Sequence, residues 1–187
     1  MTPHVGVRLA DPERDAVAVA GIYRPAVESH VSFEETCPDA AEMAGRMSRT
    51  LQRTPWLVAE SATNGAVVGY AYASAHRERA GYRWSVDVSV YVDAAWQRHG
   101  VGRMLYDHLL VELRRQHFVN AYAGVALPNP SSVALHGAVG MKLIGIYERV
   151  GFKNGEWLDV AWFGMRLIEP DDPPSEPIAL PELVPPP

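Results

Sequence analysis

The sequence predicts a single α/β domain with a mixed sheet, an α+β arrangement, because strand-like segments alternate along the chain with amphipathic helical segments. The clearest strand runs from Trp84 to Val92, where valines alternate with polar residues, and a helix with regular leucine spacing follows it as far as Leu113. A length of 187 residues suits one core, and 48% hydrophobic with 21% charged residues is ordinary globular usage. We therefore expect one domain over residues 1–168 and a separate tail over residues 169–187.

The first half of the chain predicts a strand, two helices and two further strands. Asp11 followed by Pro12 is a helix start, and Asp39 stands three residues before a glutamate, which is capping-box spacing. An Asn64-Gly65 turn joins the last two strands as a hairpin. The expected ranges are a strand over 5–9, a helix from 12 that ends before 30, a helix reaching 51, and strands over 56–60 and 66–74.

The second half continues the alternation after the strand that ends at Val92. Asn129 heads a short helix, because its side chain can cap the free N–H groups there. The expected ranges are a helix from 101 to about 117, a strand over 119–127, a helix over 131–139, and strands over 143–149 and 157–167.

The tail beyond Ile168 differs in composition from the rest of the chain. It holds eight of the 15 prolines and five of the 22 acidic residues, with no Lys or Arg. Because proline lacks a backbone donor and fixes φ, we expect an extended, disordered tail; a Pro-rich docking peptide is the alternative. Residues 1–168 hold as many acidic as basic residues, which gives no uniform basic field for nucleic acid.

Cysteine content and hydropathy narrow the setting further. Cys37 is the only cysteine, so the chain can form no internal disulfide and no Cys-rich metal cage. No H-x-x-x-H pair with an acid is present, and no apolar run reaches about 18 residues. We expect a cytoplasmic protein with no metal and with neither a nucleic-acid nor a membrane partner.

The turn between Gln97 and Gly102 is a candidate phosphate site. It joins a strand to a helix N-terminus, whose free N–H groups attract anions, and its glycines let a phosphate approach the backbone. Arg98, His99 and Arg103 would add donors. The turn matches neither a P-loop nor the dinucleotide fingerprint, and a glycine-rich turn without a ligand is the alternative interpretation.

Short motifs accompany this turn along the chain. They are Ser32-Phe33-Glu34, Pro55 to Glu60, Gly69 to Ala73, Tyr82-Arg83-Trp84, Ser89 to Val92, Leu127-Pro128-Asn129, Leu135-His136 and Gly151 to Val160. In this order, with the Q-R-x-G-x-G turn, they resemble the GNAT-type N-acetyltransferases, and more narrowly the phosphinothricin and methionine sulfoximine acetyltransferase branch. The resemblance covers residues 5–167 and implies a GNAT-like fold. It also implies direct transfer of acetyl from acetyl-CoA to the amine of a small amino-acid-like substrate.

The resemblance implies where the coenzyme binds. The diphosphate of acetyl-CoA would lie on the amides of the turn, and the preceding strand would offer its backbone to the pantetheine and thioester. A fixed N–H is apt there, because attack by an amine puts negative charge on the thioester oxygen. Helix capping is the structural alternative for Asn129. The expected coenzyme-binding residues are Val90, Tyr91, Val92, Arg98, His99, Gly100, Val101, Gly102, Arg103, Asn129 and Ser132.

Two residues are candidates for proton transfer, because an ammonium substrate must lose a proton before it attacks. Asp87 lies on the polar face of the clearest strand, where the branch usually has Glu. Its carboxylate is retracted by roughly one C–C bond, about 1.5 Å, which fits a water relay or an ammonium clamp. His136 matches a His of the branch and would exchange a proton with the sulfur or the amine. A solvated carboxylate and a packing histidine are the alternatives.

The arginine-rich loop before Trp84 is the candidate substrate site. Guanidinium groups suit bidentate binding of a carboxylate or phosphinate, and the resemblance points to Arg79 and Tyr82. A basic surface loop, and packing for the tyrosines, are the alternatives. The expected substrate-binding residues are Phe33, Glu34, Arg77, Arg79, Tyr82, Ser85 and Tyr106.

The resemblance implies a homodimer, and we assign Trp56, Trp157 and Trp162 to packing or a subunit interface. Two other functions stay open. One is a noncatalytic acyl-CoA-binding sensor, in which Asp87 marks lost chemistry, and the other is acetylation of a peptide N-terminus. Polycationic substrates are disfavoured, because the loop arginines would repel them.

Overall fold

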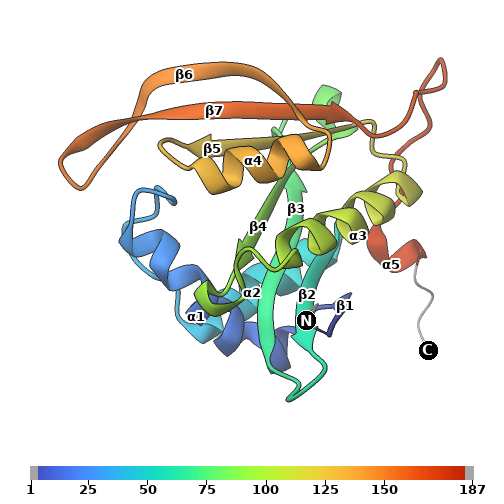
Figure 1. The fold of residues 1–187 in the computed structure, drawn as a ribbon. Coiled ribbons are helices and arrows are strands. Elements are labelled where there is room, and N and C mark those ends of the chain that lie inside the picture. Colours follow the sequence, from blue (N-terminus) through green and yellow to red (C-terminus); the bar gives the residue numbers. More distant parts are fainter. Residues whose placement is uncertain (1–3, 184–187) are drawn as a thin grey trace.

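A seven-stranded sheet with the order β1-β2-β3-β4-β5-β7-β6 lies at the centre of the computed structural model, which describes residues 4–183 (Figure 1). The β4–β5 pair is parallel and the other neighbouring pairs are antiparallel, so the predicted mixed sheet is confirmed. The strands are β1 (Val5–Leu9), β2 (Trp56–Ser61), β3 (Val67–Ala75), β4 (Ser85–Val92), β5 (Asn120–Ala126), β6 (Lys142–Lys153) and β7 (Glu156–Arg166).

The predicted helices form behind the predicted caps. Asp11 accepts from the N–H groups of Glu13 and Arg14. Asp39 caps the helix that begins at Ala40, and Asn129 caps the helix that begins at Pro130, also through side-chain oxygens. The helices are α1 (Pro12–Glu28), α2 (Ala40–Leu51), α3 (Val101–Arg115), α4 (Pro130–Ala138) and the short α5 (Leu180–Leu183), with 3-10 turns η1 (Ala80–Tyr82) and η2 (Ala94–Trp96). None of these helices is long and apolar enough to cross a bilayer, within the residues described.

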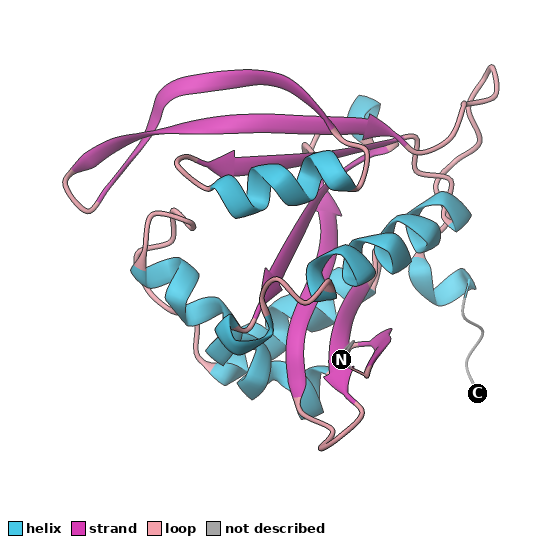
Figure 2. Cartoon of the chain, viewed as in Figure 1, coloured by secondary structure: helices cyan, strands magenta, loops and turns pink. Residues whose placement is uncertain are grey.

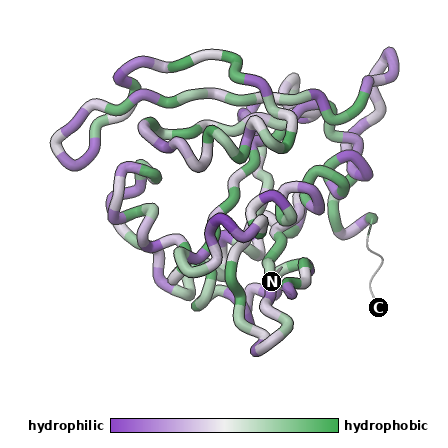
Figure 3. The backbone as a smooth tube through the Cα atoms, in the orientation of Figure 1, coloured by the Kyte–Doolittle hydropathy of each residue, from purple (hydrophilic) through white to green (hydrophobic). Residues whose placement is uncertain are grey.

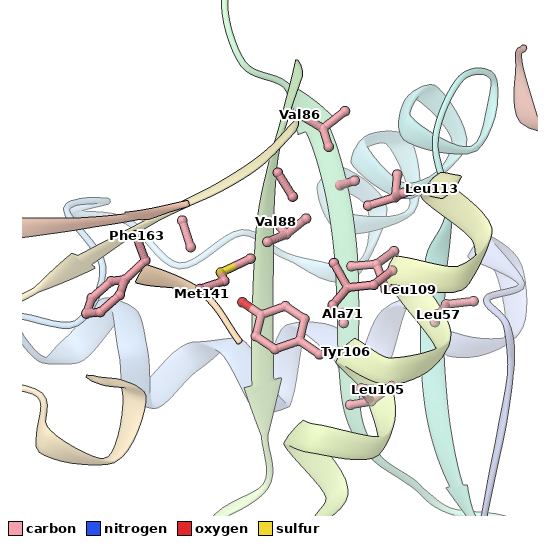
Figure 4. Packing of buried hydrophobic residues seen from close by; sticks show 14 of the residues in the cluster. Leu57, Ala71, Val86, Val88, Leu105, Tyr106, Leu109, Leu113, Met141 and Phe163 are labelled. Atoms are coloured by element: carbon pink, nitrogen blue, oxygen red, sulfur yellow. The ribbon is translucent and has the colours of Figure 1, made fainter. Parts of the chain in front are cut away.

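Helices cover both faces of the sheet (Figure 2). On one face, α3 packs Leu105 and Leu109 against the valines of β4, including Val88 (Figure 4). On the other face, α1 and α2 enclose β2 and β3 through residues such as Met47 and Tyr70. The alternation predicted for β4 therefore separates two environments, because its valines face α3 and its polar residues face the side of α1 and α2.

One strand is longer than expected. β6 was predicted to end at residue 149, but it continues to Lys153 through a register irregularity between Tyr147 and Gly151, where Arg149 has a φ of 48°. Such a bulge interrupts the alternating pattern, so the periodicity of the sequence marked only the first part of the strand.

The segment after β7 is extended as predicted, but it is not independent of the domain. Ile178 and the buried Gln116 exchange two hydrogen bonds of 2.9 and 2.8 Å, and Leu180 is buried at the start of α5. The expectation of a disordered tail is therefore corrected for residues 175–183, because Ile178 and Leu180 supply contacts that a proline count overlooks. Residues 184–187 lie outside the described residues.

Candidate functional site

The predicted phosphate turn opens α3. Gly100 is the N-cap residue with a φ of 83°, and Arg98 has a φ of 62°, so both adopt the left-handed region. The first intrahelical bond runs from the N–H of Met104 to the carbonyl of Gly100. The amides of Val101, Gly102 and Arg103 precede that bond and therefore have no partner within the helix. These donors, at the positive end of a helix and beside exposed basic residues, suit an anion.

Gly102 lets α3 approach two other elements closely. A Cβ at this position would lie 3.1 Å from Cδ2 of Leu135 on α4 and 3.6 Å from Cγ2 of Val92 at the end of β4. A side chain at Gly102 would therefore have to displace Leu135, so the glycine favours the close packing of the turn. The cradle fits the diphosphate that the family resemblance implies.

β4 and β5 separate beside this turn. They pair over three positions, from Ser85 with Asn120 to Asp87 with Tyr122, and Figure 1 shows the two strands running in different directions beyond that point. The carbonyl of Trp84 accepts from Asn120 on the β5 side. Because N–H groups alternate along a strand, those of Val90 and Val92 point to that same side, where β5 has turned away.

Tyr91 does not share this arrangement. Its backbone points toward β3, where it pairs with Tyr70, and its ring packs edge-on against Tyr23 of α1 with centroids 5.0 Å apart. Of the three strand residues expected at the coenzyme, the structure directs the N–H groups of Val90 and Val92 toward the gap and that of Tyr91 away from it.

His136 is buried on α4 with both ring nitrogens occupied. Nδ1 lies 2.7 Å from the carbonyl of Ser132, and Nε2 lies 3.0 Å from the hydroxyl of Tyr106. A carbonyl only accepts, so Nδ1 carries the hydrogen and Nε2 accepts from Tyr106. Burial lowers the pKa of His136, which favours the neutral ring.

Tyr106 thus lies with His136 rather than with the arginine-rich loop. It is fully buried in the core on the α3 side of the sheet, close to Met141 and Phe163 (Figure 4). The predicted grouping of Tyr106 with the substrate loop is therefore not seen. Asn129 accepts from the N–H of Ser132, so the capping alternative for Asn129 is observed.

Asp87 lies on the opposite face of β4 and is paired with a residue that sequence reasoning missed. Its Oδ1 is 2.6 Å from Nδ1 of His76, and the exposed fraction of the Asp87 side chain is 27%. Burial raises the pKa of Asp87, while the hydrogen bond from His76 and the charge of Arg77 act in the opposite direction. This environment differs from that of a solvated strand carboxylate.

The register of β3 and β4 brings His76 to this position. Ser74 pairs with Asp87, and just beyond the end of β3 the N–H of His76 still donates to the carbonyl of Ser85. If the two strands are assumed to form an antiparallel hairpin, pairing their residues from the loop outward would have indicated the contact between His76 and Asp87. The long loop between the strands hides the register from sequence, because only short turns fix it.

The arginine-rich loop between β3 and β4 lies close to the His76–Asp87 pair. Tyr82 lies edge-on to His76 with centroids 6.0 Å apart, and the guanidinium of Arg77 lies 5.9 Å from the ring centroid of Trp162. Arg79 is exposed at the start of η1. The structure therefore places the predicted substrate loop beside Asp87 and Ser85, at the junction of β3, β4 and β5.

Glu34 and Phe33 come from the loop after α1. Arg46 of α2 binds both oxygens of Glu34, at 2.7 and 2.9 Å, and holds the pKa of that carboxyl below its usual range. Glu34 lines a cavity of about 280 Å³ that extends to Ser74, the register partner of Asp87. Phe33 lies over Gly151 of β6, where any Cβ would overlap its ring.

Lys153 fastens this loop to the end of β6. Its buried Nζ donates to the carbonyls of Val27, Ser32 and Glu34, at 2.6 Å for Ser32 and 2.7 Å for Glu34. Three charge-assisted hydrogen bonds to carbonyls fix the backbone that presents Phe33 and Glu34.

Over residues 4–183, no group of three or more His, Cys, Asp or Glu side chains is arranged to hold a metal ion.

The helix N-terminus can bind an anionic group, and the unpaired amides of β4 can stabilise an oxyanion that forms during acyl transfer, so the site suits an acyl-CoA-dependent transferase. The model of the acetyltransferase (GNAT) domain matches residues 10–162. The chain belongs to this family, and it is an acetyl-CoA-dependent N-acetyltransferase. Both the predicted family resemblance and the predicted fold are confirmed.

Relatives with named activities cover most of the chain. The phosphinothricin N-acetyltransferase of Streptomyces viridochromogenes is 39% identical over 161 residues, which is 86% of each chain. The L-methionine sulfoximine/L-methionine sulfone acetyltransferase of Salmonella typhimurium is 34% identical over 165 residues, 87% of this chain and 95% of that one. The phosphinothricin acetyltransferase of Sinorhizobium meliloti, crystallised in complex with AcCoA, has a TM-score of 0.84 at 36% identity and covers 95% of this chain and 94% of its own.

Proposed function

We propose that this enzyme acetylates the amine of a small amino-acid-like substrate, of the phosphinothricin or methionine sulfoximine type, using acetyl-CoA. One observation carries the proposal. A loop with three arginines and Tyr82 lies beside Asp87 at the fork of β4 and β5, and β4 leads from Asp87 to the anion cradle. A substrate bound by its acid group at the loop would therefore present its amine between Asp87 and the thioester.

Residues of the turn and of α4 would hold the coenzyme. The amides of Val101, Gly102 and Arg103, with Gly100 as the N-cap and Arg98 and His99 beside them, would hold the diphosphate. The N–H groups of Val90 and Val92 would donate to the thioester oxygen, and Asn129 and Ser132 would border the pantetheine arm. When bound, acetyl-CoA supplies the activated acyl group.

The loop side chains would select the other substrate. Arg79 and Arg77 bind an oxyanion such as a carboxylate or phosphinate, and the Tyr82 hydroxyl adds a donor. Phe33 and Glu34 wall the pocket from the α1–α2 side, and the ion pair of Glu34 keeps that wall fixed.

We assign proton transfer to two residues, Asp87 and His136, which lie on opposite faces of the sheet. Asp87 would hold the ammonium group or take part in a relay that removes its proton. His136 would relay the other proton: its neutral ring can take up at Nε2, beside the Tyr106 hydroxyl, the second proton that the attacking nitrogen loses, and this proton then passes to the leaving sulfur.

The test measures CoA thiol release with phosphinothricin, methionine sulfoximine, the common L-amino acids and a short peptide with a free N-terminus. We expect turnover with the small amino acids. Asp87→Asn and His136→Ala should each lower kcat at least tenfold, about 1.4 kcal/mol in activation free energy. The exposed Asp172→Asn in the tail serves as the matched control. Acetyl-CoA binding without turnover would instead support the sensor, and preference for the peptide would support N-terminal acetylation.

We also propose that the enzyme is a homodimer joined along β6. Figure 3 shows green, hydrophobic stretches of the chain along β6. The large hydrophobic side chains there are about half exposed, and an apolar surface of this kind favours burial against a second copy. They are Leu143, Ile144, Ile146, Tyr147, Val150, Phe152 and, on β7, Trp157.

Light scattering coupled to gel filtration tests the dimer. The wild type should have twice the monomer mass of 20.6 kDa, and Ile144→Glu with Ile146→Glu should return it to the monomer mass. The exposed Val17→Glu on α1 is the matched control and should leave the dimer intact. A wild-type monomer at micromolar concentration would contradict the proposal.

The setting we assign is the cytoplasm. A single unpaired cysteine and a balanced charge over residues 1–168 support an enzyme that meets a small substrate there rather than nucleic acid or a membrane surface.

A further inference from the structure

His76 and Asp87 form a pair at the fork of β4 and β5. Nδ1 of His76 lies 2.6 Å from Oδ1 of Asp87, and the exposed fractions of the two side chains are 16% and 27%. Asp87 is the last β4 residue that pairs with β5, through Tyr122. The pair thus lies where the two strands begin to separate, next to the substrate loop.

The hydrogen bond fixes which nitrogen of the imidazole carries the hydrogen. A carboxylate has no hydrogen to donate, so Nδ1 of His76 is the donor and Nε2 carries a lone pair. An imidazole in this state accepts a proton at Nε2, while the carboxylate stabilises the cation that forms. Asp87 alone would offer a carboxylate that lies closer to the backbone than that of a glutamate. With His76 bound to it, the proton acceptor is instead Nε2, on the side of the ring away from Asp87.

Three aromatic side chains hold the ring in place. The centroid of His76 is 4.6 Å from Tyr122 of β5, 6.0 Å from Tyr82 of η1 and 6.3 Å from Trp162 of β7. Arg77 donates to the backbone carbonyl of His76, so it is the charged neighbour besides Asp87. A ring fixed by three elements and one hydrogen bond is preorganised, as a proton acceptor needs to be.

The geometry points to His76 as the general base of acetyl transfer, with Asp87 as the residue that orients it. This inference rests on the proposed function. The substrate ammonium gives one proton to Nε2 of His76, and the neutral amine forms a bond to the acetyl carbon. As the carbon–sulfur bond breaks, the electron pair leaves with the sulfur, and the second proton of the nitrogen ends on that sulfur. The products are the acetylated amine and the CoA thiol, and His76 releases its proton to solvent.

Two substitutions separate a base from a structural contact. His76→Phe keeps the ring packing and removes both nitrogens. His76→Asn keeps a donor near the position of Nδ1 but removes the acceptor nitrogen Nε2. We expect the Phe and Asn variants to lower kcat about 100-fold, the magnitude typical of a lost general base, with the acetyl-CoA dissociation constant unchanged. The exposed His108→Gln on α3 is the matched control.

The double variant His76→Phe, Asp87→Asn should be no slower than the worse single variant, because two residues that act as one unit are not additive. The pH profile of kcat should have an ascending limb in the wild type that is lost in His76→Phe, because the base is no longer present. Recovery by His76→Asn to within threefold of the wild type would overturn the base and leave only a contact that positions Asp87.

Nuclear magnetic resonance of the free protein gives a readout that does not depend on turnover. In ¹⁵N-labelled wild type at pH 8, His76 should carry its hydrogen on Nδ1, and Asp87→Asn should disturb that state. A hydrogen on Nε2 would overturn the proposal. A wild type that binds acetyl-CoA but acetylates no amine would overturn the proposed function as well, whereas a fully active His76→Phe would overturn the base alone.

Discussion

Replacing Gly102 with valine is expected to weaken acetyl-CoA binding by about 100-fold, or about 2.8 kcal/mol, the scale of one or two lost hydrogen bonds to a charged group. A Cβ at Gly102 would approach Leu135 to 3.1 Å, and the two extra methyl groups of valine increase the overlap. The start of α3 must then move away from α4, and the amides of Val101 to Arg103 move with it. Isothermal titration calorimetry with acetyl-CoA measures the dissociation constant.

Gly137→Val on α4 is the matched control, because a Cβ there meets no atom within 4 Å. It should bind acetyl-CoA with a dissociation constant within threefold of the wild type. Circular dichroism shows whether each variant is folded. A folded Gly102→Val with unchanged affinity would place the diphosphate somewhere other than the turn.

Replacing Asp15 with asparagine should lower the free energy of unfolding by about 1.5–3 kcal/mol, because the buried carboxylate loses its charge-assisted hydrogen bonds from Arg8. The exposed fraction of the Asp15 side chain is 1%, and Arg8 binds its two oxygens at 2.6 and 2.8 Å. The Asp15 carboxylate also accepts from the N–H of Asp11, where α1 begins. Urea unfolding measures the loss. Glu13→Gln, in the same helical turn but exposed, is the control and should cost less than about 1 kcal/mol.

The pH dependence of stability follows from the same ion pair. Burial by itself raises the pKa of Asp15, but the hydrogen bonds and charge of Arg8, with the Asp11 N–H, outweigh it and lower the pKa. A lowered native pKa contributes stability that is present above the unfolded value, near pH 3.9, and is lost as the pH falls through the native value. The wild type should therefore lose part of its stability in acid, and Asp15→Asn should show a shallower loss. Parallel acid profiles for the two proteins would contradict this assignment.

Local sequence signals predicted the elements well. Asp11, Asp39 and Asn129 cap the helices as expected, because a cap depends on side-chain and backbone groups only a few residues apart. The alternation of β4 was sufficient to predict which of its residues share a face. The bulge in β6 and the docking of Ile178 onto Gln116 were not predictable in this way, since neither follows a repeating pattern.

The candidate site divides along the same line. The sequence by itself determined the phosphate turn, because its glycines and the N-terminus of α3 are contiguous in the chain. It also determined that Asp87 lies on the polar face of β4. Only the tertiary structure decided that His76 binds Asp87, that Tyr106 binds His136, and that Arg46 holds Glu34. These contacts depend on strand register and on the packing of helices against opposite faces of the sheet. Their free energy comes from groups that meet only after the chain has folded, so no local pattern records them.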